Sequence, residues 1–224
     1  MEQRTYNQFC ATARTLDLVG ERWTMLLIRE LLTGPKRYGD LQASLRGLGT
    51  GLLAARLKHL EREGLARKVV LPPPARVPAY ALTEAGEELG PAVLALAQWG
   101  LKWAMDERRA GETFHADWAV LGMRACFVPD AAAGLRAVYE FHVGEDVLHA
   151  RVDDGTLETV HGPAQRPDAT ITITEDELAA VTSRRQTLSG AITAGTATVT
   201  GDREALRRLP DLFRLPPQSR RVEG

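Results

Sequence analysis

The sequence predicts an α+β protein with two domains. In the first half of the chain, apolar residues recur at helical spacing around one short two-stranded pattern. Beyond residue 113, apolar and polar residues alternate instead, which is typical of a half-buried antiparallel sheet. The segment DERRAGET at 106–113 separates the two patterns with charge and glycine. We therefore expect one domain at 1–110, a second at 111–217 and a polar tail at 218–224.

Two short amphipathic helices joined by a glycine turn are predicted between residues 36 and 63. Leu41 and Leu45 give the first helix one apolar stripe, and the string GLG that follows supplies a flexible turn. Thr50 is a good N-cap, so the second helix is expected to start at Gly51. This arrangement is a helix-turn-helix.

The second of these helices has two distinct faces. Leu53, Leu57 and Leu60 recur at the spacing of a core-facing stripe. Small, basic and polar groups that suit base edges occupy the other side, namely Leu52, Ala55, Arg56 and His59. That side is the candidate recognition surface.

A β-hairpin is expected directly after the second helix. Gly64 ends the helix, a β-rich run at 65–71 turns at three prolines, and residues 77–82 return as a second strand. Arg76 lies at the tip, where it could enter a minor groove or meet a phosphate. The hairpin makes the motif a winged helix-turn-helix. The string GLGTG is not interpreted as a nucleotide fingerprint, because it follows a helix and not a strand.

The distribution of charge supports DNA binding in the first domain. The whole chain carries 28 Lys and Arg against 29 Asp and Glu, so its overall balance indicates nothing about nucleic acid. Residues 36–80, however, hold nine basic groups and three acidic ones, whereas residues 111–224 hold twelve and seventeen. Only the first region is suited to phosphate.

A long apolar helix between residues 84 and 109 is a candidate dimer contact. Leu96, Trp99 and Trp103 belong to an apolar stripe too large for a small winged domain to bury alone. Pro91 should kink or restart this helix because it lacks an amide donor. The alternative is that the two tryptophans pack onto the second half of the chain.

The C-terminal half shows a sequence of strands with two capped helices. Alternation predicts strands around residues 139–143, 148–152, 157–160, 169–173 and 196–200. Thr174 followed by Glu177 forms a capping box for one helix, and Asp202 caps a last helix. This is an α+β domain.

Residues 9–103 resemble the HxlR family of bacterial winged-helix regulators. The markers are an early cysteine, the strings GERWTMLLIREL, GPKRYGDL and LLAARLKHLEREGL, and the exit YALTEAG. The resemblance implies a homodimer that places one recognition helix per subunit in successive major grooves. Gly51 departs from the commoner polar residue there. From patterns and resemblance together, the expected DNA contacts are Arg37, Tyr38, Thr50, Gly51, Leu52, Ala55, Arg56, His59 and Arg76.

Cys10 is a candidate redox site. In several members of that family a cysteine near this position senses oxidants or electrophiles, chemistry that needs an exposed thiolate. Arg14, one helical turn away, would favour the thiolate. A buried, inert thiol is the alternative. Cys126 lies in an apolar run and is expected in the core, and two cysteines do not make a disulfide framework.

The C-terminal half resembles the sterol-carrier-protein-like domain, an antiparallel sheet covered by helices. The markers are PDATITITEDELAAV and SGAITAGTATVTGDREALRRL. The resemblance implies an apolar ligand between sheet and helices. The candidate pocket residues are Phe141, Leu148, Ile173, Val199 and Phe213, and the alternative is that they fill an ordinary core.

Enzymatic, metal and cofactor chemistry are not expected. His142 and His149 with Asp153 and Asp154 lack the ligand spacing of a zinc site, and no recognisable nucleophile setting is present. No signal peptide or membrane-length apolar stretch appears, so a cytoplasmic protein without membrane contact is expected.

The predicted function is a transcriptional regulator that binds a double-stranded, pseudo-palindromic operator as a homodimer. An apolar small molecule in the second domain would modulate operator affinity. One alternative places sensing at Cys10, with the second domain as a brace. Another is a hydrophobe carrier whose winged domain only dimerises and does not bind DNA.

Overall fold

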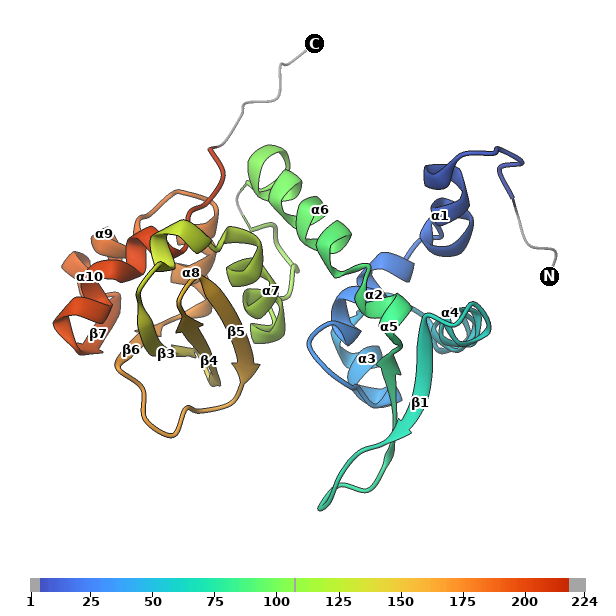
Figure 1. Ribbon diagram of the computed structural model, residues 1–224, viewed down its shortest axis with the longest axis horizontal. Coiled ribbons are helices and arrows are strands. Elements are labelled where there is room, and N and C mark those ends of the chain that lie inside the picture. The colour runs from blue at the N-terminus through green and yellow to red at the C-terminus, as the bar shows by residue number, and fades with distance from the viewer. Residues whose placement is uncertain (1–4, 107, 218–224) are drawn as a thin grey trace, which may run out of the picture. The chain divides into compact units, whose positions relative to one another are not determined.

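The computed structural model describes residues 5–106 and 108–217, so the tail expected at 218–224 lies outside the described residues. The chain divides into two compact units, Met1–Val93 and Leu94–Gly224 (Figure 1). The division falls inside one helix, earlier than the boundary expected after residue 110, and the domain assignment stays a prediction. Within the described residues, none of the helices has the length and apolar character needed to span a membrane.

The N-terminal unit is a set of helices followed by a two-stranded wing. Its elements are α1 (Ala11–Val19), α2 (Thr24–Leu31), α3 (Tyr38–Ser44), α4 (Thr50–Arg62), β1 (Ala66–Val70), β2 (Pro78–Leu82) and α5 (Glu84–Glu87). The two strands pair antiparallel, with Ala66 opposite Leu82. The predicted winged helix-turn-helix is confirmed, with α3 and α4 as its helix pair.

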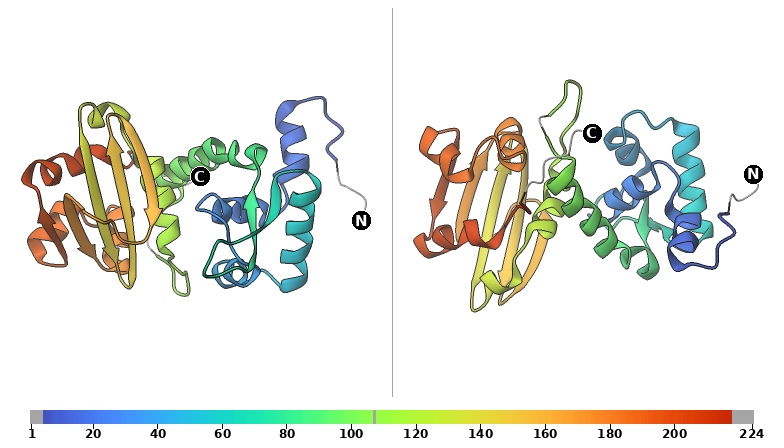
Figure 2. Two further views of the ribbon diagram at one scale, coloured as in Figure 1. Left: turned by 60° about the horizontal axis from the view of Figure 1, so that its bottom comes forward. Right: turned by 90° about the horizontal axis from the view of Figure 1, so that it is seen from above.

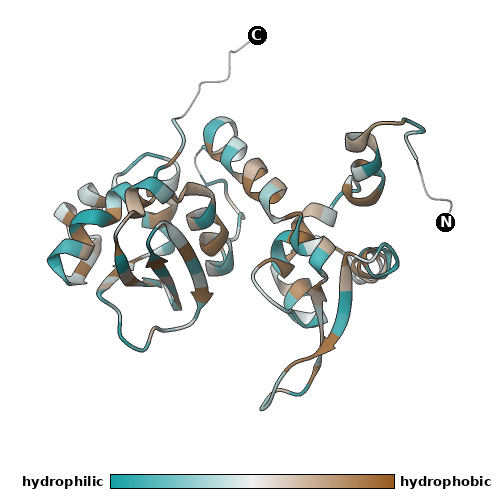
Figure 3. Cartoon of the chain, in the orientation of Figure 1, coloured by the Kyte–Doolittle hydropathy of each residue, from teal (hydrophilic) through white to brown (hydrophobic). Residues whose placement is uncertain are grey.

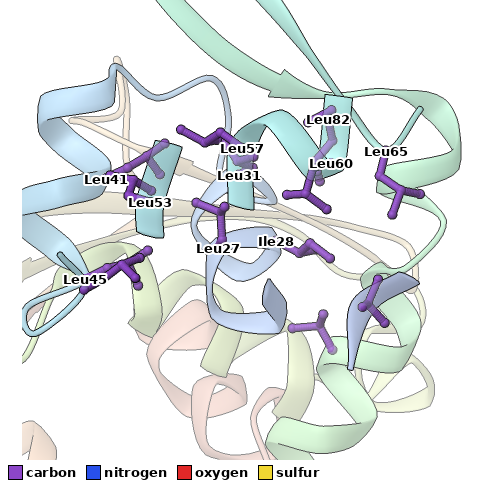
Figure 4. Packing of buried hydrophobic residues seen from close by; sticks show 14 residues of the cluster. Leu27, Ile28, Leu31, Leu41, Leu45, Leu53, Leu57, Leu60, Leu65 and Leu82 are labelled. Atoms are coloured by element: carbon purple, nitrogen blue, oxygen red, sulfur yellow. The ribbon is translucent and has the colours of Figure 1, made fainter. Parts of the chain in front are cut away.

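Leucine side chains from every helix of the motif make the core of this unit (Figure 4). Leu53, Leu57 and Leu60 of α4 are fully buried, as their spacing predicts. They meet Leu27 and Leu41 from α2 and α3. Burying one such side chain stabilises the fold by about 2 kcal/mol, so the leucine stripe fixes which side of α4 faces inward.

The start of α4 differs from the prediction. Gly49, and not Thr50, is the N-cap, and Thr50 is the first helical residue. No side chain caps this end, whereas Gly49 has the extended backbone that a cap position requires. Thr50 is therefore free to present its side chain on the surface at the helix start.

The prediction for Pro91 is confirmed. Helix α5 ends at Glu87 and α6 (Gly90–Trp103) begins three residues later, with Pro91 in its first turn. Proline is tolerated there because the first amides of a helix have no intrahelical partner. Leu89 and Val93 pack against the leucine core of the N-terminal unit.

The C-terminal unit is an α+β domain, as predicted. Its elements are α7 (Ala116–Cys126), the 3₁₀ turn η1 (Pro129–Ala132), β3 (Arg136–Val143), β4 (Asp146–Asp153), β5 (Thr156–His161), β6 (Ala169–Ile173), α8 (Glu175–Thr182), α9 (Leu188–Ala194), β7 (Ala197–Gly201) and α10 (Arg203–Leu212). The sheet order is β5-β4-β3-β6-β7. Helices α9 and α10 lie near β7, as the views in Figure 2 show.

The sheet is mixed and not purely antiparallel. Strands β3 and β6 pair parallel, with Phe141 opposite Ile171, whereas the other pairs are antiparallel. The β4–β5 hairpin and residues 162–168 form the crossover that a parallel pair needs. The crossover is held to β3, because Glu140 accepts from the Ala164 amide and Asp168 from the Val138 amide. Alternating hydrophobicity has the same period in both pairings, so the sequence pattern could not distinguish them.

Both predicted helix caps of this unit are confirmed. The Thr174 hydroxyl accepts from the Glu177 amide at 3.1 Å, and the Asp202 carboxylate accepts from the Ala205 amide at 2.9 Å. Helices α7 and α9 were not predicted. The buried side of the sheet carries two apolar clusters, and Phe141 contacts both of them.

Candidate nucleic-acid interface

A side-chain hydrogen bond joins the two helices of the helix-turn-helix. The Tyr38 hydroxyl at the start of α3 donates to the Thr50 carbonyl at the start of α4, at 2.8 Å. Asp40 accepts from the Arg37 amide at 3.1 Å and so closes the first turn of α3. The Arg37 side chain is exposed beside this junction. The expected contacts Arg37, Tyr38 and Thr50 therefore lie together where the two helices begin.

One face of α4 is uncovered, and it lies opposite the buried leucine stripe. At 3.6 residues per turn, Gly51, Ala55 and Arg62 lie nearly opposite that stripe and Lys58 lies about 130° from it, and all four are exposed. Leu52 is 41% exposed at the edge of this face. The face combines small residues, which allow close approach, with two cations.

Arg56 and His59 lie between the buried stripe and the exposed face, and both have intramolecular partners. The Arg56 guanidinium donates to Glu21 at 2.8 Å, and its side chain is only 15% exposed. The His59 ring lies 2.7 Å from the Leu18 carbonyl through Nε2, and Arg62 lies 2.8 Å from its Nδ1. Of the four residues predicted to form the recognition surface, the structure leaves Leu52 and Ala55 exposed.

Lys58 is a candidate contact that the sequence analysis missed. Its side chain is exposed, and it has no ion-pair partner in the part of the chain that the structure describes. Helical periodicity alone does not single it out, because Lys58 and His59 both lie about 130° from the leucine stripe, on opposite sides of the helix.

Arg76 lies in the loop that joins β1 to β2 in the wing, a hairpin that Figure 1 shows. The loop is closed by the Leu71 amide, which donates to the Val77 carbonyl at 3.0 Å. Arg76 is exposed and has a left-handed backbone, with φ of 41°. Arg67 and Lys68 are exposed on β1, whose outer end is coloured hydrophobic in Figure 3. The wing therefore offers cations along one strand and at its tip.

The predicted dimer residues share one face of α6. Leu96, Trp99 and Trp103 are 57%, 56% and 37% exposed, and their spacing of three and four residues places them side by side. Gln98 donates to the Ala125 carbonyl at 2.7 Å from elsewhere on the helix. Two half-exposed tryptophans on one helix are an apolar surface suited to a protein partner.

The two cysteines have opposite environments. Cys10 is exposed at the N-cap of α1, where the Ala13 and then the Thr12 backbone N–H lower the pKa of its thiol. Helix amides, and not Arg14, are thus the cause of the shift. Cys126 is buried, and burial raises its pKa to about 11. The prediction that Cys126 is a core residue is confirmed.

The residues predicted to line a ligand pocket all lie on the helix-covered face of the sheet or against it. Phe141, Val199 and Phe213 are partly buried in one apolar cluster, and Leu148 and Ile173 are buried in the other. The rings of Phe141 and Phe213 meet edge to face, with 6.5 Å between centroids. On the central strand, Tyr139 and Val143 are fully buried, but Phe141 between them is not. Among the described residues, no group of three or more His, Cys, Asp and Glu is arranged to hold a metal.

Comparison with known proteins identifies two family matches. The model of the HxlR-like helix-turn-helix family matches residues 18–108, and that of the alkyl sulfatase C-terminal domain matches residues 128–219. The second match carries a different description from the sterol-carrier-like domain expected from the sequence, and that likeness stays a prediction.

Relatives and solved structures align with the N-terminal half. The uncharacterized HTH-type transcriptional regulator YvaP of Bacillus subtilis is 34% identical over 91 residues, which are 40% of this chain and 83% of that protein. A Mycobacterium bovis regulator, Mb3122, is 41% identical over 90 residues, 40% of this chain and 56% of its own length. The reduced form of the transcriptional regulator YodB from B. subtilis is 31% identical, covers 42% of this chain and 92% of that chain, and has a TM-score of 0.37. With the winged helix-turn-helix in place and most of YvaP matched at this identity, the chain belongs to the HxlR-like helix-turn-helix family.

Proposed function

We propose that the protein is a DNA-binding regulator of transcription that acts as a homodimer on a pseudo-palindromic operator. The observation that carries this function is the uncovered face of α4, directly opposite its buried leucine stripe. Small residues on that face allow close approach to base edges, and the cations around it suit phosphate. Residues 1–110 serve as the DNA-binding and dimerisation domain. The contacts to DNA are assigned to Arg37, Tyr38, Thr50, Gly51, Leu52, Ala55 and Arg76.

The test uses a duplex that the wild-type protein selects from a random-sequence pool, called here the selected duplex. Binding is followed by fluorescence anisotropy over a range of salt concentrations. Arg76→Ala should weaken binding and lower the magnitude of the salt slope by about 2 per dimer, because each subunit loses one phosphate contact. Arg166→Ala, an exposed arginine in the β5–β6 connection, is the matched control. If wild-type protein binds no duplex even at low salt, the proposal is wrong and the carrier alternative gains support.

A second candidate function is the binding of an apolar small molecule by residues 111–217. The incomplete burial of Phe141 in the middle of the central strand favours it, because a well-filled core would cover that ring. In the sterol-carrier-like interpretation, the ligand lies against Phe141, Leu148, Ile173, Val199 and Phe213. Binding would then change operator affinity, and operator would change ligand affinity by the same factor.

Native mass spectrometry of the purified protein tests the ligand. An added mass that organic solvent releases is expected for bound apolar ligand, and Phe141→Trp should reduce its occupancy by filling the space. The exposed substitution Thr172→Val on the opposite side of β6 is the control. Protein that carries no adduct, and whose stability an added panel of fatty acids and sterols leaves unchanged, would favour a structural brace.

A third candidate is oxidant sensing by Cys10. Exposure at a helix N-terminus together with the lowered thiol pKa supports it, since the thiolate is the reactive form. Peroxide should then change the affinity of the wild-type protein for the selected duplex. Cys10→Ser should bind with unchanged affinity and lose that response, whereas an equal response in both proteins excludes Cys10 as the sensor.

A further inference from the structure

We propose that Arg56 and His59 position the recognition helix instead of contacting DNA, and that Lys58 is the cation that α4 brings to the duplex. The proposal rests on the DNA-binding function proposed above and assigns separate tasks to neighbouring residues of one helix.

Arg56 is committed to the interior side of α4. Its guanidinium donates to Glu21 at 2.8 Å, and 15% of its side chain is exposed. Its Nε is buried and has no hydrogen-bond partner among the described residues. Glu21 is therefore the group that compensates the charge, and a swing of Arg56 toward DNA would leave Glu21 without that partner.

A second polar contact ties α4 to the same part of the chain. Because Arg62 can only donate to Nδ1 of His59, the imidazole carries its proton on Nε2 and donates it to the Leu18 carbonyl. Leu18 is in the last turn of α1, and Glu21 lies two residues beyond the end of that helix at Val19. Both contacts thus bind α4 to residues 18–21, which we call the α1–α2 corner.

The hydrogen bonds of Arg56 and His59 to the α1–α2 corner oppose a rotation of α4 about its own axis, which the leucine core opposes only weakly. Leu53, Leu57 and Leu60 form a single stripe, so a small roll of α4 about that stripe keeps the leucines in contact. Arg56 and His59 lie to one side of the stripe, where a bond to the α1–α2 corner opposes the roll. The roll angle decides which of Gly51, Ala55 and Lys58 points at the groove floor.

Lys58 has the properties that Arg56 lacks as a DNA contact. It is exposed, it lies on the face opposite the leucine stripe, and it has no ion-pair partner in the described part of the chain. An ammonium on a flexible stem suits a phosphate oxygen and needs no fixed geometry. Arg62 on the same face is engaged with Glu63 at 2.9 Å.

The effect of neutralising Glu21 distinguishes the two roles of Arg56. If Arg56 contacts DNA, Glu21 competes with phosphate for it, and Glu21→Gln tightens binding to the selected duplex. If Arg56 positions α4, the same substitution weakens binding, by about tenfold for a coupling of ordinary size. The direction in which Glu21→Gln changes the affinity therefore distinguishes the two roles of Arg56.

A salt titration separates contact from positioning. Lys58→Gln should lower the magnitude of the salt slope by about 2 per dimer, since one phosphate contact is lost in each subunit. Arg56→Gln should weaken binding about tenfold with the slope unchanged, and Arg56→Lys should recover part of the loss because its ammonium still reaches Glu21. Arg151→Gln, an exposed arginine of the C-terminal unit, is the control and should change neither quantity.

A charge exchange completes the design. The double variant Glu21→Arg, Arg56→Glu restores the ion pair with the two charges exchanged. Its affinity for the selected duplex should therefore be closer to wild type than that of Arg56→Glu alone. A contact role predicts the opposite, because a glutamate would face phosphate. Circular dichroism and thermal unfolding of each variant establish that it is folded at the assay temperature, and Glu21→Gln remains decisive if the exchange is not folded.

The outcomes keep this proposal apart from the proposed function. Wild-type protein that binds no duplex would remove the function itself. Two results would keep the function and overturn the assignment of Arg56. One is tighter DNA binding by Glu21→Gln than by wild type. The other is a salt slope that falls in Arg56→Gln and not in Lys58→Gln. Weakened binding on Glu21→Gln with an unchanged slope supports it.

Discussion

Helices α4 and α6 each leave one face uncovered, but the two faces have opposite chemistry. The uncovered face of α4 carries Gly51, Ala55 and Lys58, which are small or charged. That of α6 carries Leu96, Trp99 and Trp103, which together expose a large apolar surface. Amphipathic spacing alone predicts both helices and treats their outer faces alike.

The difference indicates what kind of partner each face can take. A face without large side chains lets the backbone approach a groove closely, and a cation beside it adds attraction to phosphate. Burying half-exposed tryptophans against a partner lowers the free energy because water is excluded, and tryptophan is enriched in protein–protein contacts. The chemistry of each exposed face therefore indicates its partner. Substitutions on the α4 face should leave dimerisation intact, whereas substitutions on the α6 face should weaken DNA binding only by separating the two subunits.

The largest effect expected is on stability, from the buried side of α4. Leu57→Ala should lower the free energy of unfolding by about 3 kcal/mol, because it removes buried methyl groups and leaves a cavity. Lys58→Ala, the adjacent exposed residue, should change stability by less than about 0.5 kcal/mol and weaken binding to the selected duplex. Urea unfolding and anisotropy measure the two quantities. A Lys58→Ala protein as destabilised as Leu57→Ala would contradict the assignment of the faces.

The next effect concerns the apolar face of α6. Trp99→Glu should convert a dimer into a monomer, because an ionised carboxylate would be buried at the contact. Affinity for the selected duplex should then fall by about a hundredfold, since two linked half-site contacts become one. Sedimentation velocity and anisotropy check the two parts.

Ala104→Glu serves as the matched control for that substitution. Ala104 is exposed and directly follows the end of α6, so it adds the same charge without removing apolar surface. The control should remain dimeric. Trp99→Glu protein that still sediments as a dimer would show that the subunits meet elsewhere, or that the wild type is a monomer if it sediments identically at every concentration.

Much of the winged fold could be predicted from sequence because local signals agree with the core. The stripe of Leu53, Leu57 and Leu60, the helix-ending Gly64 and the turn prolines each act over a few residues. The cap of α4 was misplaced by one residue, since Gly49 and Thr50 are both acceptable caps. Boundaries are decided by such small differences.

Features that depend on distant partners could not be predicted. Nothing local indicates that Arg56 meets Glu21, thirty-five positions earlier in the chain, or that His59 meets the Leu18 carbonyl. The parallel pairing of β3 with β6 likewise depends on where the crossover returns. The helix and the wing could therefore be predicted from the sequence, whereas the intramolecular partners of Arg56 and His59 became evident only in the three-dimensional structure.

The smallest effect on the fold is expected at the cysteines, which differ between the two units. The backbone N–H of Ala13 and of Thr12 lowers the pKa of the Cys10 thiol below its usual value, whereas burial raises that of Cys126 to about 11. A thiol alkylates as thiolate, so the alkylation rate of each rises as pH passes its pKa. Timed iodoacetamide labelling between about pH 6 and 10 should therefore modify Cys10 first, with a midpoint below that of an ordinary thiol, and leave Cys126 unlabelled.

Because the Cys10 side chain is exposed, labelling it should not shift the thermal unfolding temperature. Folded Cys10→Ser protein should take up almost no label, and equal labelling of both cysteines in the wild type would mean that the C-terminal core opens far more readily than its burial indicates.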